Sequence, residues 1–309
     1  MTVLRITRTL LAGAAIAVAG AAVAYAAPAV AAPQPAAPVT AGSFYLALGD
    51  SVPFGFREGN NKPFPDYTDA ANFRGYPELI GQALDLKVIN ASCPGETSGS
   101  FIDVTAQSNG CEANSDGVAA AGYRTNFPLH RNYSGSQLAY AKSFLSAHLK
   151  NTKLVTLQLG ANDGYICQKE TADQCTSPTE IGPVVQQIAA NVTKIVKQLR
   201  KTGYTGQILA VNYYSIDYTN TIAGATTTLG VQAINNGLDS GAQANDNQYK
   251  VRVATPFGAF KTASKVTDGD VCAAGLLTIL TAGTTPCGVH PSVAGQFVIA
   301  NKVIEKIRK

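Results

Sequence analysis

The stretch FYLALGDS, residues Phe44 to Ser51, is an apolar run of strand length that ends abruptly in Gly-Asp-Ser. Four further runs of this kind occur at residues 86–90, 154–159, 207–211 and 251–254. Apolar residues with helical spacing occupy residues 76–84, 136–150, 183–201, 228–244 and 293–308. The alternation predicts a three-layer α/β/α domain with a central, mainly parallel five-stranded sheet covered by helices on both faces.

The Gly-Asp-Ser tripeptide follows the carboxyl end of the first predicted strand, where open α/β sheets bind their ligands. Taken alone it is weak evidence, because a tight turn with a helix-capping serine has the same residues. Three further motifs follow later in the chain and should reach the same edge of the sheet. They are NASCPGETS at residues 90–98, LGAND at residues 159–163 and GVHPS at residues 288–292.

In this order the four motifs resemble those of the SGNH hydrolases, the GDSL esterase/lipase family, and most of all the secreted actinobacterial lipases with three disulfides. The resemblance extends from Phe44 to the last predicted helix. It implies a flavodoxin-like SGNH hydrolase fold. It also implies Ser51 as the nucleophile, His290 as the base, and Ser51, Gly95 and Asn162 as donors of an oxyanion hole.

Ester chemistry independently favours His290 among the three histidines. A serine hydroxyl attacks an ester only when a neighbouring imidazole removes its proton. His148 falls in the polar end of a predicted helix and His130 in a loop, as ordinary surface histidines do. His290 precedes Pro291, a favoured first helical residue, and the positive end of that helix should keep its ring neutral.

The group that orients His290 is not evident from the sequence. Most of the family has an aspartate three residues before the histidine, but Cys287 occupies that position here. Three explanations remain: an acid such as Asp268 or Asp270 reaches the histidine, the enzyme uses a Ser-His dyad, or a backbone carbonyl accepts the Nδ1 proton. We favour the carbonyl of Cys287, which a disulfide to Cys272 would hold in place.

Two loops should shape substrate specificity, residues 57–74 and the insert at residues 103–134. The aromatic residues that follow Ser51 have two equally good interpretations, as the wall of an acyl-binding groove or as core and loop packing. These residues and their apolar neighbours are Val52, Pro53, Phe54, Phe56, Phe64, Tyr67, Phe73 and Tyr76.

Six cysteines in a chain with an export signal favour disulfides over metal ligands. None lies in a CxxC pair, and six cysteines allow fifteen connectivities. Sequential pairing closes three short polar loops, so we expect the bonds Cys93 to Cys111, Cys167 to Cys175, and Cys272 to Cys287.

Residues 1–32 have the pattern of a secretory signal peptide, with two arginines, a long Ala/Val/Leu run and several A-x-A sites. An uncleaved membrane anchor is the alternative. A Pro/Ala-rich linker at residues 33–43 should lead into the catalytic domain at residues 44–309. We therefore expect a secreted protein with a cleaved signal peptide, and association with the cell envelope is a further possibility.

The composition excludes several classes of function. Charged residues are only 14% of the chain and form no basic block, which argues against nucleic acid as a partner. No P-loop or GxGxxG fingerprint follows a strand, so we expect no nucleotide cofactor and no metal. The sequence predicts a monomeric serine esterase or lipase that acts on lipid or short-chain esters without an obligatory protein partner. A carbohydrate O-deacetylase, a phospholipase or a non-catalytic binding protein of the same fold is the alternative.

Overall fold

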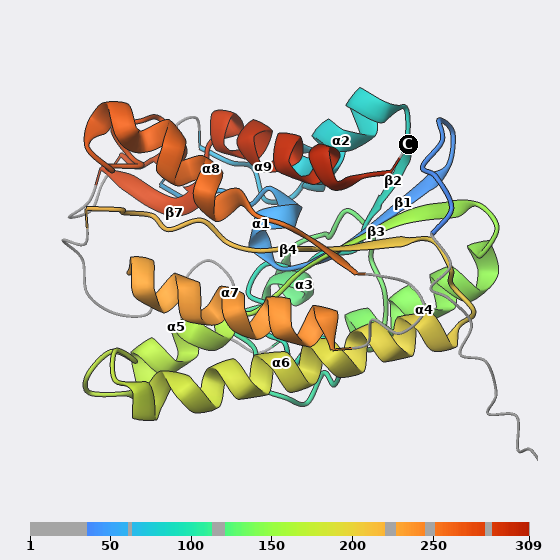
Figure 1. The fold of residues 1–309 in the computed structure, drawn as a ribbon, viewed down its shortest axis with the longest axis horizontal. Coiled ribbons are helices and arrows are strands. Elements are labelled where there is room, and N and C mark those ends of the chain that lie inside the picture. The colour runs from blue at the N-terminus through green and yellow to red at the C-terminus, as the bar shows by residue number, and fades with distance from the viewer. Residues whose placement is uncertain are drawn as a thin grey trace, which may run out of the picture. The chain divides into compact units, whose positions relative to one another are not determined.

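The computed structural model describes residues 36–60, 64–112, 121–219, 227–244, 251–281 and 286–308. Its centre is a sheet of five parallel strands in the order β2-β1-β3-β4-β5 (Figure 1). The strands are β1 (Phe44–Gly49), β2 (Lys87–Asn90), β3 (Thr152–Gln158), β4 (Gln207–Val211) and β5 (Arg252–Ala254). The predicted α/β fold is confirmed, and the strand order is that of flavodoxin-like sheets.

The strands are apolar because helices cover both faces of the sheet. In β1 every residue after Phe44 is buried, and β4 is buried throughout. On one face lie α2 (Tyr76–Leu84), α8 (Pro256–Ala263) and α9 (Val293–Lys306), as Figure 1 shows. The opposite face carries α4 (Gln137–His148), α5 (Ala161–Glu170), α6 (Pro178–Lys201) and α7 (Thr228–Gln243).

The five predicted helices are present, and α6 shows why the pattern works. Its buried residues Ile188, Val192, Ile195, Val196 and Leu199 recur at helical spacing. The helix begins at Pro178, earlier than expected, because proline at the first helical position needs no N–H partner. The segments α1 (Ser51–Phe54), α3 (Tyr123–Asn126), α5 and α8, and the short 3₁₀ turns η1 (Ala70–Asn72) and η2 (Ser264–Thr267), were not predicted.

A second, antiparallel pair of strands carries the histidine motif. It consists of β6 (Leu277–Ile279) and β7 (Cys287–Pro291). His290 therefore lies in a strand, and α9 begins only at Val293, with Ser292 as its N-cap. His290 thus lies two residues before the N-cap of the last helix, but the expectation that Pro291 is the first residue of that helix is wrong.

Three disulfides have the expected sequential pairing. They join Cys93 to Cys111, Cys167 to Cys175, and Cys272 to Cys287. Each closes a short loop, which stabilises the fold mainly by restricting the unfolded chain. Three disulfides also suggest an oxidising, extracellular compartment.

Both ends of the described domain meet at the sheet edge where the strands begin. The backbone N–H of Val39 donates to the carbonyl of Arg308 over 3.0 Å. The Gln207 side chain, at the start of β4, donates to the carbonyls of Ala37 and Arg308. Part of the expected linker is thus packed on the domain, while residues 1–32 lie outside the described residues. Within the described ranges, no helix has both the length and the apolar character needed to cross a membrane.

Candidate active site

Ser51 stands at the sheet edge where the strands end, on the sharp turn between β1 and α1. Asp50 caps this short helix by accepting a hydrogen bond from the N–H of Val52 over 3.0 Å. Gly49 permits the turn: its φ is 140°, and a Cβ there would lie 2.2 Å from the carbonyl oxygen of Gln158. The buried Gln137 side chain also bonds both the N–H and the carbonyl of Gly49. The serine is therefore held rigidly.

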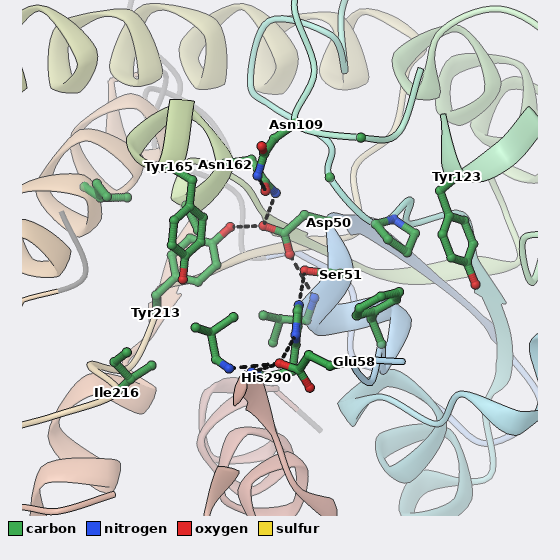
Figure 2. A pocket seen from close by; sticks show the side chains of 18 of the residues that line it. Asp50, Ser51, Glu58, Asn109, Tyr123, Asn162, Tyr165, Tyr213, Ile216 and His290 are labelled. Carbon is green, nitrogen blue, oxygen red and sulfur yellow. Dashed lines mark hydrogen bonds and ion pairs between the residues drawn. The ribbon is translucent and has the colours of Figure 1, made fainter. Parts of the chain in front are cut away.

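His290 lies within hydrogen-bonding distance of Ser51, although the two are 239 residues apart in the chain. The Ser51 hydroxyl donates to Nε2 of His290 over 2.9 Å (Figure 2). The Phe56 ring packs edge-on against the imidazole with 4.9 Å between ring centroids. This is the geometry of a hydroxyl nucleophile beside its general base.

Glu58 orients the imidazole from the opposite side. Its Oε1 atom lies 2.8 Å from Nδ1 of His290. A carboxylate only accepts, so Nδ1 carries the proton and Nε2 is left free to accept from Ser51. The predicted orienting group, the carbonyl of Cys287, is therefore corrected: an ionised carboxylate fills this role. Of the suggested acids, Asp270 instead accepts from the N–H of Ala273, and Asp268 is exposed.

The surroundings of Glu58 favour its ionised form. Burial alone would raise the pKa of this carboxyl, but the charge of His290 and the hydrogen bonds from His290 and Thr278 lower the pKa to about 2. Thr278 donates to Oε2 over 2.6 Å, and the backbone N–H of Val289 donates to Oε1 over 2.9 Å. The close approach of the Glu58 carboxylate to β7 requires glycine at position 288, because a Cβ there would lie 2.0 Å from Oε1 of Glu58.

The sequence contains a signal for Glu58 outside the four motifs. Glu58 is the first acid after Ser51 and the only one before Asp66. It lies in the loop of residues 57–74, which was expected only to shape specificity. Its role depends on a contact across 232 residues of sequence, which no local pattern reveals.

The predicted oxyanion-hole residues lie together around the same cavity as Ser51. Gly95 has a φ of 84°, and a Cβ there would lie 2.6 Å from the carbonyl oxygen of Asn109. Asn162, in the first turn of α5, is 5% exposed, and its Nδ2 donates to the carbonyl of Glu96 over 2.9 Å. Backbone and amide donors preorganised in this way can stabilise the oxyanion of a tetrahedral intermediate.

Two further polar residues support the site, and neither was singled out from the sequence for this role. The Tyr213 hydroxyl donates to the buried Asp50 carboxylate over 2.5 Å. Burial raises the pKa of Asp50 to about 6, although the bonds from Tyr213 and Val52 lower it. Nδ2 of Asn162 approaches the same Asp50 oxygen to 3.5 Å, so Asp50 lies between Tyr213 and Asn162 (Figure 2).

Asp163, the last residue of the LGAND motif, links two of the motifs. It accepts from the hydroxyl of Ser98 over 2.6 Å and from the backbone N–H of Ser98 over 2.9 Å. This contact links the segment after β2 to the first turn of α5. Gly95 and Asn162 are thereby carried on connected segments.

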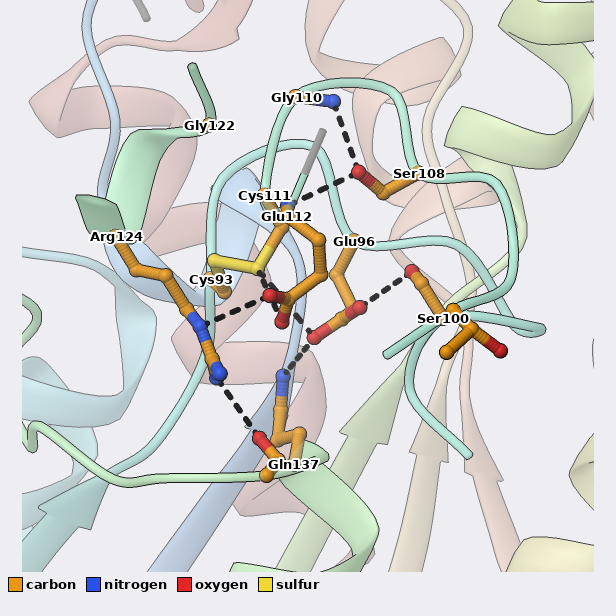
Figure 3. A network of polar contacts seen from close by, with 12 residues as sticks. Cys93, Glu96, Ser100, Ser108, Gly110, Cys111, Glu112, Gly122, Arg124 and Gln137 are labelled. Carbon is orange, nitrogen blue, oxygen red and sulfur yellow. Dashed lines mark hydrogen bonds and ion pairs between the residues drawn. A yellow bond between two sulfur atoms is a disulfide. The ribbon is translucent and has the colours of Figure 1, made fainter. Parts of the chain in front are cut away.

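A buried polar network surrounds Glu96, the residue that follows Gly95 in the chain (Figure 3). The Glu96 carboxyl is fully buried and accepts from the Ser100 hydroxyl over 2.5 Å and from Nε2 of Gln137 over 3.0 Å. Burial raises its pKa to about 8, so the group is mainly protonated at neutral pH. Glu112 and Arg124 form an ion pair nearby. The segment that carries Gly95 is thus held by the contacts of Glu96 with Ser100 and Gln137.

The cavity at Ser51 has a volume of about 400 Å³ and a mostly apolar wall. Tyr165, Tyr213 and Ile216 lie on one side of Ser51 and Tyr123 on the other (Figure 2). Of the aromatic run after Ser51, Phe56 lines the cavity, as does Val52. Phe54 and Phe73 pack in a buried cluster with Tyr123, and Phe64 is exposed. The run serves both of the purposes expected of it.

The other histidines and the cysteines lie elsewhere. His130 Nε2 bonds the carbonyl of Phe54 over 3.0 Å, and His148 packs against Phe44 and Phe144. Among the described residues, one group has the spacing of metal ligands: Cys93, Glu96 and Cys111. Its two sulfur atoms are joined in a disulfide, so neither is available as a thiolate ligand.

A match to a protein-family model shows to which family the chain belongs. The model described as the GDSL-like Lipase/Acylhydrolase family matches residues 47–297. The chain belongs to this family. It is thus a hydrolase of the GDSL type, a family of lipases and acylhydrolases. No curated protein matches the chain.

A solved phospholipase A1 and a solved lipase are similar to this chain in fold. Phospholipase A1 from Streptomyces albidoflavus NA297 is 18% identical with a TM-score of 0.50, over 86% of this chain and 100% of that one. The lipase Lip_vut3 from a goat rumen metagenome is 13% identical with a TM-score of 0.50, over 85% and 96%. An acetyl-xylooligosaccharide esterase mutant from Geobacillus is 15% identical with a TM-score of 0.49, over 88% and 100%. At these identities the likeness concerns the fold alone.

Proposed function

We propose that this GDSL family member is a secreted serine esterase or lipase that hydrolyses carboxylic esters through a covalent acyl-enzyme. One observation carries the proposal: Ser51, His290 and Glu58 form a continuous hydrogen-bonded chain in the wall of a mostly apolar cavity. This is the arrangement of a nucleophile, a base and the carboxylate that orients the base. The enzyme acts as a monomer and needs no cofactor.

In the acylation step, Ser51 Oγ attacks the ester carbonyl carbon while Nε2 of His290 takes the hydroxyl proton. The negative charge that forms on the carbonyl oxygen is stabilised by the N–H groups of Ser51 and Gly95 and by Nδ2 of Asn162. Collapse of this intermediate breaks the bond to the alcohol, which receives the proton from His290. The products are a Ser51 acyl ester and a free alcohol.

Deacylation repeats these steps with water as the nucleophile. His290 removes a proton from the water, whose oxygen attacks the acyl carbon, and Ser51 leaves with a proton returned by the imidazole. Throughout, Glu58 accepts the hydrogen bond from Nδ1 and stabilises the imidazolium form. A carboxylate stabilises that charge better than a neutral carbonyl could.

The character of the cavity favours lipid or short-chain esters as substrates. Aromatic and aliphatic side chains line most of it, which suits an acyl chain better than a sugar ring. The alternatives are phospholipid and O-acetylated carbohydrate, for which the fold relatives named as a phospholipase A1 and an acetyl-xylooligosaccharide esterase are precedents. A non-catalytic binding protein of the same fold is the third alternative.

Hydrolysis of p-nitrophenyl esters from acetyl to palmitoyl, with Ser51→Ala as the control, tests the proposal. We expect turnover that the substitution abolishes, and labelling of the wild-type protein alone by a fluorophosphonate. His290→Ala should be as inactive as Ser51→Ala, whereas His148→Ala should keep its activity. A folded wild-type protein that neither turns over nor labels would contradict the proposal and favour a non-catalytic role.

Secretion is tested separately. The three disulfides and the pattern of residues 1–32 support it. Expression of the full chain in an actinobacterial host should release a protein whose amino-terminal residue lies after the A-x-A sites. Recovery of the uncleaved chain in the membrane fraction would instead favour an anchored form.

A further inference from the structure

Asn109 contacts both residues that join Ser51 in the oxyanion hole. Its backbone N–H donates to the carbonyl of Gly95 over 2.8 Å. Its side-chain Nδ2 donates to Oδ1 of Asn162 over 2.9 Å (Figure 2). Neither the sequence motifs nor the triad geometry assigns a role to Asn109, yet one residue holds two of the three donors.

The side-chain amides of Asn109 and Asn162 form a chain whose direction is fixed at both ends. At one end, Nζ of Lys169 donates to Oδ1 of Asn109 over 3.2 Å. At the other end, Nδ2 of Asn162 donates to the carbonyl oxygen of Glu96 over 2.9 Å. An ammonium group only donates and a carbonyl only accepts, so both amides must be aligned in the same sense. This alignment directs the NH₂ group of Asn162 away from Asn109 and keeps it on the side of Glu96 and Asp50.

The loop that presents Asn109 is well anchored. The Cys93 to Cys111 disulfide joins it to the segment that carries Gly95. The buried Ser108 hydroxyl accepts from the N–H groups of Gly110 and Glu112 (Figure 3). Anchoring on both sides of Asn109 gives its side chain a defined position relative to α5.

We propose that Asn109 is a positioning residue that sets the orientation of the Asn162 amide, so that the NH₂ group faces the developing oxyanion. The inference rests on the proposed ester hydrolysis. Without the bond from Asn109, only the bond to the Glu96 carbonyl still orients the amide of Asn162. The amide then rotates more readily and can place its oxygen toward the reacting carbonyl. An oxygen in that place repels the charge that an N–H group would stabilise.

Two substitutions separate positioning from simple support of the loop. Asn109→Ala removes the side-chain bond. Asn109→Asp keeps the shape and gives Lys169 an opposite charge, but a carboxylate cannot donate to Oδ1 of Asn162. It can only accept, and so it should attract the NH₂ group of Asn162 and invert the amide. A residue that merely supports the loop would tolerate Asp better than Ala, whereas a positioning residue would not.

The matched control is Gln107→Ala in the same loop. Gln107 is exposed and its Nε2 donates to Glu170 of α5 over 2.7 Å, as Asn109 is linked to Lys169 of α5. The substitution removes a side-chain bond between the same two segments without contact to Asn162. Its turnover should equal that of the wild type.

We expect kcat on p-nitrophenyl butyrate to fall about tenfold in Asn109→Ala and about 10² in Asn109→Asp, near the effect of losing one oxyanion donor. KM should stay nearly unchanged, because the oxyanion exists only in the transition state. The thermal midpoint of the Asp variant should be no lower than that of the Ala variant. Turnover in the Asp variant equal to or above that of the Ala variant would overturn the proposal.

A second measurement tests the positioning role of Asn109 without any substrate. In ¹⁵N-labelled protein, the side-chain NH₂ protons of Asn162 should exchange slowly with solvent, and faster in Asn109→Ala but not in Gln107→Ala. Exchange that Asn109→Ala leaves unchanged would overturn the positioning role. If the wild-type protein shows no turnover and no fluorophosphonate labelling, the proposed function fails, and this measurement still tests Asn109.

Discussion

A single oxygen atom of Glu58 organises the environment of His290. Oε1 accepts from the ring Nδ1 over 2.8 Å, from the backbone N–H of His290 over 3.2 Å and from that of Val289 over 2.9 Å. The same carboxylate thus fixes the ring and the strand that carries it. The ring cannot turn about its side-chain bonds without losing a charge-assisted hydrogen bond.

Two substitutions of Glu58 should distinguish its role in orienting His290 from the effect of its negative charge. In Glu58→Gln the amide oxygen can still accept hydrogen bonds from the three N–H groups, while its NH₂ group faces the Thr278 hydroxyl. Only the negative charge is lost, so we expect kcat to fall about 10-fold to 10²-fold. In Glu58→Ala the tautomer is no longer fixed, and kcat should fall about 10³ to 10⁴. Steady-state kinetics on p-nitrophenyl butyrate provides the measurement.

The control for this series is Asp270→Ala, which removes one of the acids that the sequence had suggested. Its carboxylate accepts from the N–H of Ala273, so turnover should stay near that of the wild type. Should Glu58→Ala retain wild-type kcat, the carboxylate would have no catalytic role, and either a Ser-His dyad or a backbone carbonyl as the partner of His290 would explain the activity.

At the scale of single elements, the loop closed by Cys93 and Cys111 folds around an acid that burial keeps neutral. The pKa of Glu96 is raised to about 8 in the folded protein, against 4.5 for the ordinary carboxyl. Between these values the native state holds a proton that the unfolded chain has lost. The free energy of unfolding should therefore decrease as pH rises from about 4.5 to about 8, and change no further from this group above that range.

Glu96→Gln should remove this decrease, because an amide imitates the protonated acid and cannot ionise. Relative to the wild type, the variant should gain on the order of 3 kcal/mol in free energy of unfolding between pH 5 and pH 9. Urea denaturation at several pH values measures it. Glu170→Gln, at an exposed position of α5, is the matched control. Parallel curves for Glu96→Gln and the wild type would show that Glu96 is not protonated in the native state.

The helices and strands differ in how well the sequence predicted them. The strands and long helices were predicted because burial on two faces, or along one stripe, imposes a clear apolar period. The helix α5, with the sequence ANDGYICQKE, has no such stripe. The β6 and β7 pair has three and five residues and no alternating pattern. Such elements depend on tertiary contacts, which a single sequence does not display.

At the scale of the whole molecule, the site is made from segments that the sheet brings together. The motifs that carry Ser51, Gly95 and Asn162 could be placed at one edge of the sheet because each motif follows a strand whose carboxyl end faces that edge. The roles of the three residues came from the resemblance to the SGNH hydrolases. His290 comes from the hairpin β6 and β7, and Glu58 from a loop. The path of that loop is fixed by the contact with His290 and Thr278 and not by local chemistry. The orienting acid was missed for this reason.

The cavity is also a property of the whole molecule, and its size should set the acyl-chain preference. Ile216 is a half-buried part of the wall. Ile216→Phe narrows the cavity, so one or two methylene groups of a long acyl chain no longer fit. The kcat/KM for octanoyl esters should therefore fall about tenfold more than the kcat/KM for acetyl esters. Ile216→Ala should shift the preference toward longer chains.

The comparison of the two variants is the check on this prediction. Chain-length profiles from acetyl to palmitoyl should move in opposite directions, with the activity on acetyl esters changed least. Profiles that fall together at every length would mean that Ile216 does not border the acyl group, and would place the acyl chain on the Tyr123 side of Ser51.

The contact between Val39 and Arg308 has a practical consequence. Val39 and Arg308 are hydrogen-bonded at the edge where the strands begin, whereas Ser51 stands at the edge where they end. A fusion partner, affinity tag or solid support joined close to Val39 or Arg308 therefore attaches at the edge opposite to Ser51. Forms of the protein that are immobilised through either position should leave the cavity open to substrate.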